Sequence, residues 1–201
     1  SSSAAVGTGV AKASGYESVA FRTATAASSV DMSGVTGATF VGVQGDQNLS
    51  LSKLAAGVVV GVGESTTQDN YSGTLTAALA DATGSADSLT FKLANQAADD
   101  QIDAKLVTSG IETVTISHTA TAGQNNADLD VSGISAGTLV ITVGSVAEDL
   151  DLTNGDNSTL NAATSIVNAS ANASILHVTA STNTSTAFTA AGSSVDLIGS
   201  V

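Results

Sequence analysis

An internal repeat constrains this 201-residue chain more than any other feature of its sequence. Residues 14–21 align with residues 109–116, and residues 30–35 align with residues 129–134. The two matches occur in the same order and are about 95 to 99 residues apart. A partial third copy stands at 194–197, after an apolar run at 175–179. Repetition at a near-constant spacing is typical of folds in which one unit stacks on the next. We therefore predict one repeat unit in residues 1–95 and a second, with part of a third, in residues 96–201. Together they form one continuous structure or a segment of a larger chain.

Short alternating runs of apolar and polar residues fill the repeat units. Alternation with a period of two is the pattern of half-buried strands. Clusters rich in Gly and Asn at 45–48, 123–126 and 154–158 separate the runs and supply the positive φ angles of tight turns. Helix is predicted only for two Ala-rich stretches, 75–79 and 94–106. The strand runs lie at 18–21, 39–43, 89–93, 113–116, 138–143 and 175–179.

The spacing of these runs indicates the architecture. They recur about every 18 to 25 residues, which suits one coil of a parallel β-solenoid whose small inward side chains stack from coil to coil. An antiparallel β-sandwich, with a strand about every 8 to 12 residues, is the alternative. We predict an all-β protein with a parallel β-solenoid (β-helix) fold.

Composition excludes several classes of function. Eighteen acidic and five basic residues give a net charge of −13, and the basic residues are scattered singly. With no Trp, four Phe and two Tyr, the chain lacks the basic and aromatic patches that bind nucleic acid, so we expect no nucleic-acid partner. Its apolar runs are far shorter than the roughly 20 residues of a membrane span, so we expect no membrane insertion. No Cys is present, which excludes disulfides and zinc–thiolate sites.

The absence of Pro bears on the strand edges. Proline is a common means of keeping strand edges from pairing with other chains. Its absence is consistent with edges that stay available or with continuous stacking, and equally with neutral drift in composition.

Carboxylates occur in local clusters that could bind calcium, a cation that prefers oxygen ligands. On a strand, residues two apart face the same side, so the members of such pairs project together and repel unless a cation lies between them. The alternative is that each cluster is a solvated surface group. We expect calcium at one or more of these candidates: Asp99, Asp100, Asp103, Asp128, Asp130, Glu148, Asp149, Asp151 and Asp156.

Catalytic motifs are not found, and we predict that the chain is not an enzyme. There is no nucleophile elbow and no phosphate-binding Gly-rich loop. His118 and His177 lie within or just beyond apolar strand runs, where they are expected to be outward-facing strand residues rather than bases or ligands. Six Asn-x-Ser/Thr sequons occur, and Asn168 and Asn172 are the candidate glycosylation pair.

Residues 87–93, 109–116 and 127–131 together resemble the Ala-, Thr-, Gly- and Ser-rich body of bacterial S-layer proteins of the RTX type. In that family, D-x-L-x-L and G-[IV]-E-[TN]-V strands recur along the chain. The resemblance implies a β-solenoid, type I secretion, and calcium-dependent assembly into a surface lattice. The nonapeptide calcium repeat of the family is absent as a run, which places these residues in the lattice-forming body.

Two functions are therefore expected for an extracellular, cell-surface protein. In the first, the chain is a self-assembling lattice component stabilised by calcium, and its main partner is itself, with cell-surface polysaccharide as a further candidate. In the second, it is a filament subunit or a calcium-dependent adhesin module.

Overall fold

The computed structural model describes residues 4–5, 8–23, 26–63, 71–93, 102–118, 127–134, 136, 138–143, 150–153, 165–168, 176–179, 187–190 and 195–198. Within these residues, eighteen strands form two sheets of nine. The odd-numbered sheet holds β1 (Ala4–Ala5), β3 (Ser18–Arg22), β5 (Phe40–Gln44), β7 (Val59–Val62), β9 (Ser88–Leu93), β11 (Thr113–His118), β13 (Thr138–Val143), β15 (Ser165–Asn168) and β17 (Ala187–Ala190). The even-numbered sheet holds β2 (Gly9–Ser14), β4 (Ser28–Thr36), β6 (Leu49–Leu54), β8 (Tyr71–Leu79), β10 (Ile102–Thr108), β12 (Ala127–Ile134), β14 (Leu150–Thr153), β16 (Leu176–Thr179) and β18 (Val195–Ile198).

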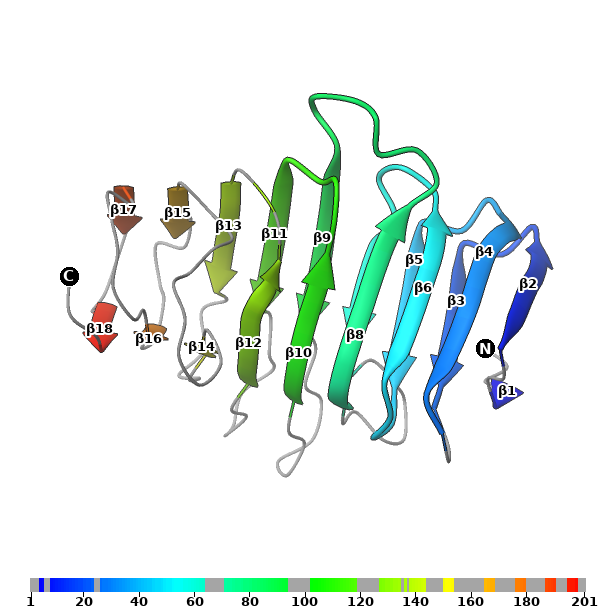
Figure 1. Cartoon of the computed structure of the whole chain (residues 1–201), viewed down its shortest axis with the longest axis horizontal. Helices are drawn as coiled ribbons and strands as arrows, with labels where there is room; N and C mark the ends of the chain where they lie inside the picture. Colours follow the sequence, from blue (N-terminus) through cyan, green and yellow to red (C-terminus); the bar gives the residue numbers. More distant parts are fainter. Residues whose placement is uncertain are drawn as a thin grey trace.

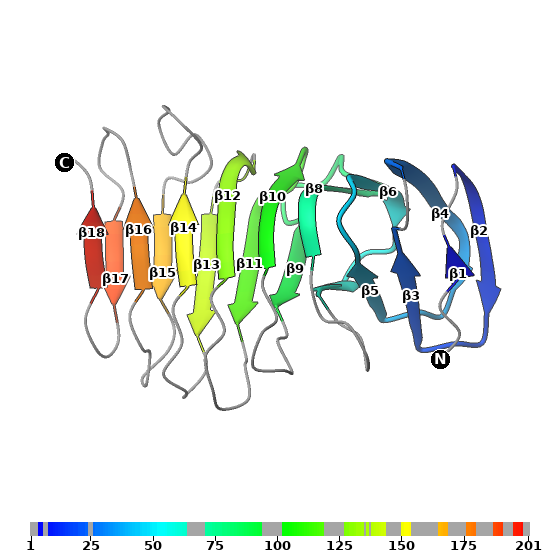
Figure 2. The same cartoon turned by 90° about the horizontal axis from the view of Figure 1, so that it is seen from below.

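Each strand pairs with the strands two before and two after it in the chain, so consecutive strands alternate between the sheets. Figure 1 shows the two layers facing each other. In Figure 2 the strands follow one another along a single axis, with the N-terminus at one end and the C-terminus at the other. The chain therefore advances by one odd-numbered and one even-numbered strand at a time, which is consistent with a β-solenoid.

Every strand pair in the described part of the chain is parallel (for example β10 with β8 and β12). The all-β prediction is confirmed, and the antiparallel sandwich considered as its alternative is wrong for these strands. The helix predictions are also wrong where they can be compared. Residues 75–79 belong to β8 and residues 102–106 to β10, while 94–101 lie outside the described residues. The helix propensity of Ala was overridden because alternate residues of both stretches are buried against the opposite sheet.

The core lies between the two sheets and is formed by the apolar residues that alternate with polar residues along each strand. In β10, for example, Ile102, Ala104 and Leu106 are buried while Asp103 and Lys105 face outward. Inward residues of both sheets form one continuous apolar cluster. The interior holds larger side chains than the sequence suggested, because leucines occupy much of the even-numbered sheet and the rings of Phe91 and Tyr71 are fully buried.

Coil length varies more than predicted. Register partners are 19 residues apart at Val41 and Val60 but 31 apart at Val60 and Phe91. Most of the extra residues fall outside the strands, and the sheets continue in parallel across the longer coil. They also continue from β9 to β11 and from β8 to β10, across the junction predicted near residue 95 between the two units.

The sequence repeat maps onto matching places in the fold. Residues 18–21 and 113–116 lie in β3 and β11 of the odd-numbered sheet, and residues 30–35 and 129–134 lie in β4 and β12 of the even-numbered sheet. Gly15 and Gly110 hold the same motif position and both have a positive φ, of 77° and 68°, a conformation that glycine adopts without a steric cost. The partial third copy at 194–197 falls largely on β18 of the even-numbered sheet.

A bulge accompanies the repeated motif of β4 and β12. The register of β4 against β2 shifts just before Gly34, and that of β12 against β10 shifts just before Gly133. At both places the strand presses against the preceding coil, where a Cβ atom would overlap the carbonyl oxygen of Ala11 or Leu106. The motif thus keeps a glycine where two backbones come close together.

The repeated motif at residues 14–21 and 109–116 fixes a turn between coils. In the second copy, the amide of Asp87 donates to Oε2 of Glu112 at 2.8 Å, and the amides of Glu112 and Thr113 donate to the carbonyl oxygen of Asp87 at 3.1 Å. In the first copy, the carbonyl oxygen of Glu17 accepts the amides of Thr39 and Phe40. Both copies satisfy backbone groups where a strand begins, which sheets require at their ends.

Candidate functional site

Three aspartates on adjacent strands are aligned by register across the even-numbered sheet. Asp103 of β10 is the register partner of Asp128 of β12, which is in turn the partner of Asp151 of β14. We call these three residues the acidic column. Asp103 and Asp128 are exposed, and neighbouring strands lie about 4.8 Å apart. Carboxylates opposite one another at this spacing repel, so a cation beside them would lower the electrostatic energy of the column.

One lysine lies beside the acidic column. Nζ of Lys105 donates to Oδ2 of Asp130 at 3.1 Å, and the two residues are register partners on β10 and β12. As a period of two requires, Asp128 and Asp130 lie on the same side of β12, with Leu129 buried between them. This ion pair ties β10 to β12 next to the acidic column.

The remaining predicted ligands are placed less completely. Asp99, Asp100, Glu148, Asp149 and Asp156 lie outside the described residues, and the structure gives only a strand position for Asp151. Among the described side chains, no three His, Asp or Glu residues come together closely enough to hold a metal ion. Calcium takes about six to eight oxygen ligands, so the described part of the acidic column supplies only part of a complete set.

Sequence reasoning missed the acidic column because it grouped carboxylates by proximity in the chain. The structure instead selects one residue from each of three groups and aligns them across three coils. A signal was present, since Asp103, Asp128 and Asp151 follow one another at about the spacing predicted for one coil. Parallel pairing turns that spacing into a ladder of neighbours.

A second ion pair joins β4 to β6. Nζ of Lys53 donates to Oδ2 of Asp31 at 2.6 Å, while the amide of Ser33 donates to Oδ1 at 2.8 Å. The hydrogen bond from Lys53, followed by those from Ser33, lowers the pKa of Asp31 to about 2. Asp31 and Asp130 occupy the same position of the repeated motif, so both copies place a lysine from an adjacent strand on this carboxylate.

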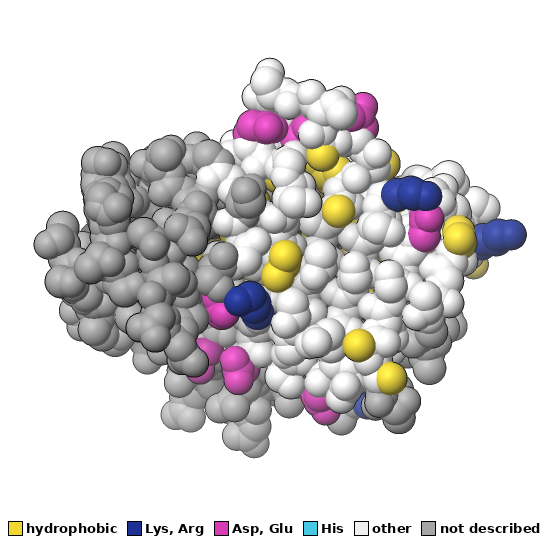
Figure 3. Space-filling view, viewed as in Figure 1, with side chains coloured by type: hydrophobic (Ala, Val, Ile, Leu, Met, Phe, Trp, Pro, Cys, Tyr) yellow, Lys and Arg dark blue, Asp and Glu magenta, His cyan; other side chains and the backbone are white. Residues whose placement is uncertain are grey.

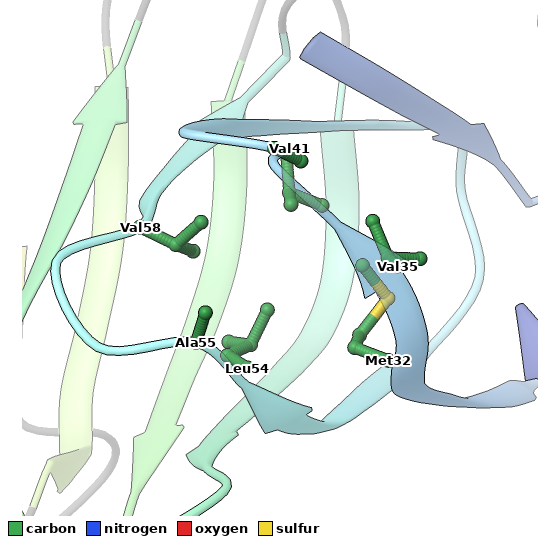
Figure 4. A pocket seen from close by; sticks show the side chains of 7 residues that line it. Met32, Val35, Val41, Leu54, Ala55 and Val58 are labelled. Atoms are coloured by element: carbon green, nitrogen blue, oxygen red, sulfur yellow. The ribbon is translucent and has the colours of Figure 1, made fainter. Parts of the chain in front are cut away.

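A small hollow lies between the ends of β4 and β6 and the starts of β5 and β7. Figure 4 shows Met32, Val35, Val41, Leu54, Ala55 and Val58 around it, and Ala38 completes the lining. Its volume is about 10 Å³, close to the smallest space that holds one water molecule. With an apolar lining, the hollow is a packing defect rather than a ligand site.

The coloured part of the face in Figure 3 is mostly uncharged, with a few basic side chains and with acidic side chains near its top and in its lower half. His118 lies on β11 and His177 on β16, where His177 is the register partner of Asp151 and Asp196. Asn168 ends β15, and Asn172 lies outside the described residues.

Together, the described strands define an all-β protein of two stacked parallel sheets, and their register aligns the three aspartates of the acidic column. No family model, curated protein or solved structure gave a significant match to this chain. In the described part of the chain there is no helix of the length and hydropathy needed to cross a membrane.

Proposed function

We propose that this chain is a structural cell-surface protein, a parallel β-solenoid that assembles with copies of itself into an extracellular lattice stabilised by calcium. The continuous stacking of β1 to β18 in two parallel sheets is the observation that carries the proposal. A stack of this kind has two ends and several long faces, and copies can be joined at either. The sequence resemblance to RTX-type S-layer bodies supports the same role.

The repeated motifs support a structural role because the contacts described for them hold the coils together. Glu112 accepts a hydrogen bond from the preceding coil, Gly133 allows close approach to Leu106, and Asp130 is paired with Lys105. A chain that repeats such contacts extends its own fold coil by coil. That the chain is not an enzyme stays a prediction.

Calcium is proposed because the chain is strongly acidic. A net charge of −13 opposes the approach of two copies, and register places the exposed Asp103 and Asp128 opposite each other. A divalent cation at Asp103 and Asp128 would reduce the repulsion within a copy, and between copies if the ligand set is shared. Removing calcium should therefore weaken assembly more than a matched change in ionic strength.

Negative-stain microscopy of the purified chain tests the proposal. Samples with calcium, with a chelator, and with chelator followed by excess calcium should show ordered sheets or filaments, their loss, and their return. Asp103→Asn combined with Asp128→Asn should raise the calcium concentration needed for assembly, whereas Asp46→Asn, an exposed change away from the acidic column, should not. Monodisperse single particles under every condition would overturn the proposal.

A further inference from the structure

Charge is divided unequally between the two sheets. Among the strands that the structure describes, those of the odd-numbered sheet contain Arg22 and Lys92 but no acidic residue. With His neutral, these strands carry a net charge of +2 and the even-numbered strands a net charge of −3. The even-numbered strands combine three lysines with six aspartates, which are Asp31, Asp103, Asp128, Asp130, Asp151 and Asp196. The two sheets therefore differ in the sign of their charge.

The negative charge of the even-numbered sheet is concentrated on three adjacent strands. β10, β12 and β14 together carry four aspartates and one lysine, a net charge of −3, so one bound calcium ion would leave −1. Asp103 and Asp128 are exposed register partners on the first two of these strands. A further cation beside them is therefore favourable even with calcium bound.

Lys92 lies at the matching place on the other side of the stack. β9 is the fifth strand of the odd-numbered sheet and β10 the fifth of the even-numbered sheet, counted from β1 and β2. Figures 1 and 2 show these two strands running in opposite directions, so the end of β9 and the start of β10 lie at the same edge of the stack. Lys92 is the last residue but one of β9, and Asp103 is the second residue of β10. Both alternate with buried residues, so they face outward on opposite sides.

The outer faces around these two residues consist largely of small side chains. Nζ of Lys92 lies 5.9 Å from the centre of the Phe40 ring, which occupies the space above Gly61 on the same face. Small side chains allow two sheets to approach to about 10 Å, the usual distance between stacked sheets. The outward residues concerned are Ser88 and Thr90 of β9, Thr113, Thr115 and Ser117 of β11, and Thr74, Thr76 and Ala78 of β8.

We propose that the outer face of the odd-numbered sheet around β9 binds the outer face of the even-numbered sheet around β10 and β12 of a second copy, with Lys92 opposite Asp103 and Asp128. A shift perpendicular to the sheets, without rotation, produces this contact, because Lys92 and Asp103 lie at the same level and the same edge of the stack. Charge complementarity of this kind selects which faces meet. The contact rests on the proposed function and adds the direction in which copies pack side by side. Because the two faces differ, it repeats into rows.

Three variants of the full chain test this contact by sedimentation velocity in calcium at physiological salt. Lys92→Glu and Asp103→Lys each place like charges opposite one another and should each weaken association roughly tenfold or more. Lys12→Glu makes the same charge change as Lys92→Glu at an exposed position of β2, four strands away from β10. It should associate like the wild type. Circular dichroism establishes that each variant retains its strands.

Mixing the two impaired variants separates this contact from an effect of net charge or of lost calcium. An equimolar mixture of Lys92→Glu and Asp103→Lys should regain wild-type association in alternating rows. The new carboxylate of one variant then meets the new ammonium of the other, and the unchanged faces of the two variants also meet. Loss of a calcium ligand in Asp103→Lys would not be repaired by adding Lys92→Glu.

Three results would overturn the contact while the proposed lattice function stands. They are variants that each associate like the wild type, a mixture that stays as impaired as its components, and an equal loss of association in Lys12→Glu and Lys92→Glu. A wild type that forms no assemblies at all would overturn both the contact and the proposed function.

Discussion

Gly133 of β12 lies against the carbonyl oxygen of Leu106 in the preceding coil, where a Cβ atom would come within 2.6 Å of that oxygen. Gly34 of β4 has the same relation to Ala11. The two glycines hold the same position in the repeated motif, so the repeat preserves a close approach between coils.

Gly133→Ala is expected to destabilise the fold by about 1–3 kcal/mol, because the added methyl group must push two backbones apart. Urea unfolding followed by circular dichroism measures the change. Gly9→Ala is the matched control, since a Cβ atom there has no neighbour within 4 Å. Equal effects of the two substitutions would contradict the close-approach explanation.

Glu112 should contribute to stability through its carboxylate, which accepts the amide of Asp87. Glu112→Ala is expected to cost about 1–2 kcal/mol because a partly buried amide loses its partner. Glu112→Gln should recover a large part of this loss, since the amide oxygen of Gln can still accept. Glu17→Ala, at the same motif position in the first copy but exposed, should change the unfolding free energy little.

Because of the buried Tyr71, the fold is expected to lose stability at alkaline pH. Its ring is fully buried and its hydroxyl lies 3.2 Å from the carbonyl oxygens of Gln47 and Thr74, to either of which it can donate. Burial raises the pKa of Tyr71 above its ordinary value of 10. The folded state therefore holds the Tyr71 proton more tightly than the unfolded state does. The resulting contribution to the unfolding free energy is complete below pH 10 and is lost as the pH rises above that value. The expected slope is up to about 1.4 kcal/mol per pH unit.

The measurement is the unfolding free energy between pH 9 and about pH 11. Tyr71→Phe should remove the part of the slope that belongs to this group, at the cost of about 1 kcal/mol near neutral pH for the lost hydrogen bond. Tyr16→Phe should leave the slope intact because Tyr16 is exposed. The same slope in all three proteins would exclude Tyr71 as its source.

Asp31 should titrate near pH 2 because Lys53 and Ser33 stabilise its charged form. Since this pKa is depressed, the stabilising effect is present above the ordinary aspartate pKa of about 4 and is lost as pH falls through about 2. Carboxyl-detected NMR titration measures it directly. Lys53→Met should raise the pKa of Asp31, and Lys105→Met should not. An unchanged pKa in Lys53→Met would contradict the ion pair.

Several features of the fold could be predicted because they depend on local pattern. The alternation in residues 113–116 specifies a strand with Val114 and Ile116 inward, and the repeat places its two copies in equivalent strands. The helix predicted at 75–79 failed because Ala is compatible with both states, and the burial of Leu75, Ala77 and Leu79 against the opposite sheet decided between them.

By itself the sequence determined that this chain forms short strands, that it is strongly acidic and that one design recurs along it. Only the tertiary structure decided which residues become neighbours. Asp103, Asp128 and Asp151 belong to three separate sequence clusters, yet parallel register places them side by side. Tyr16 and Ile111 occupy one motif position, yet only Ile111 is covered. The physical reason is that pairing between coils depends on the register of distant strands, which a local pattern of apolar residues does not fix.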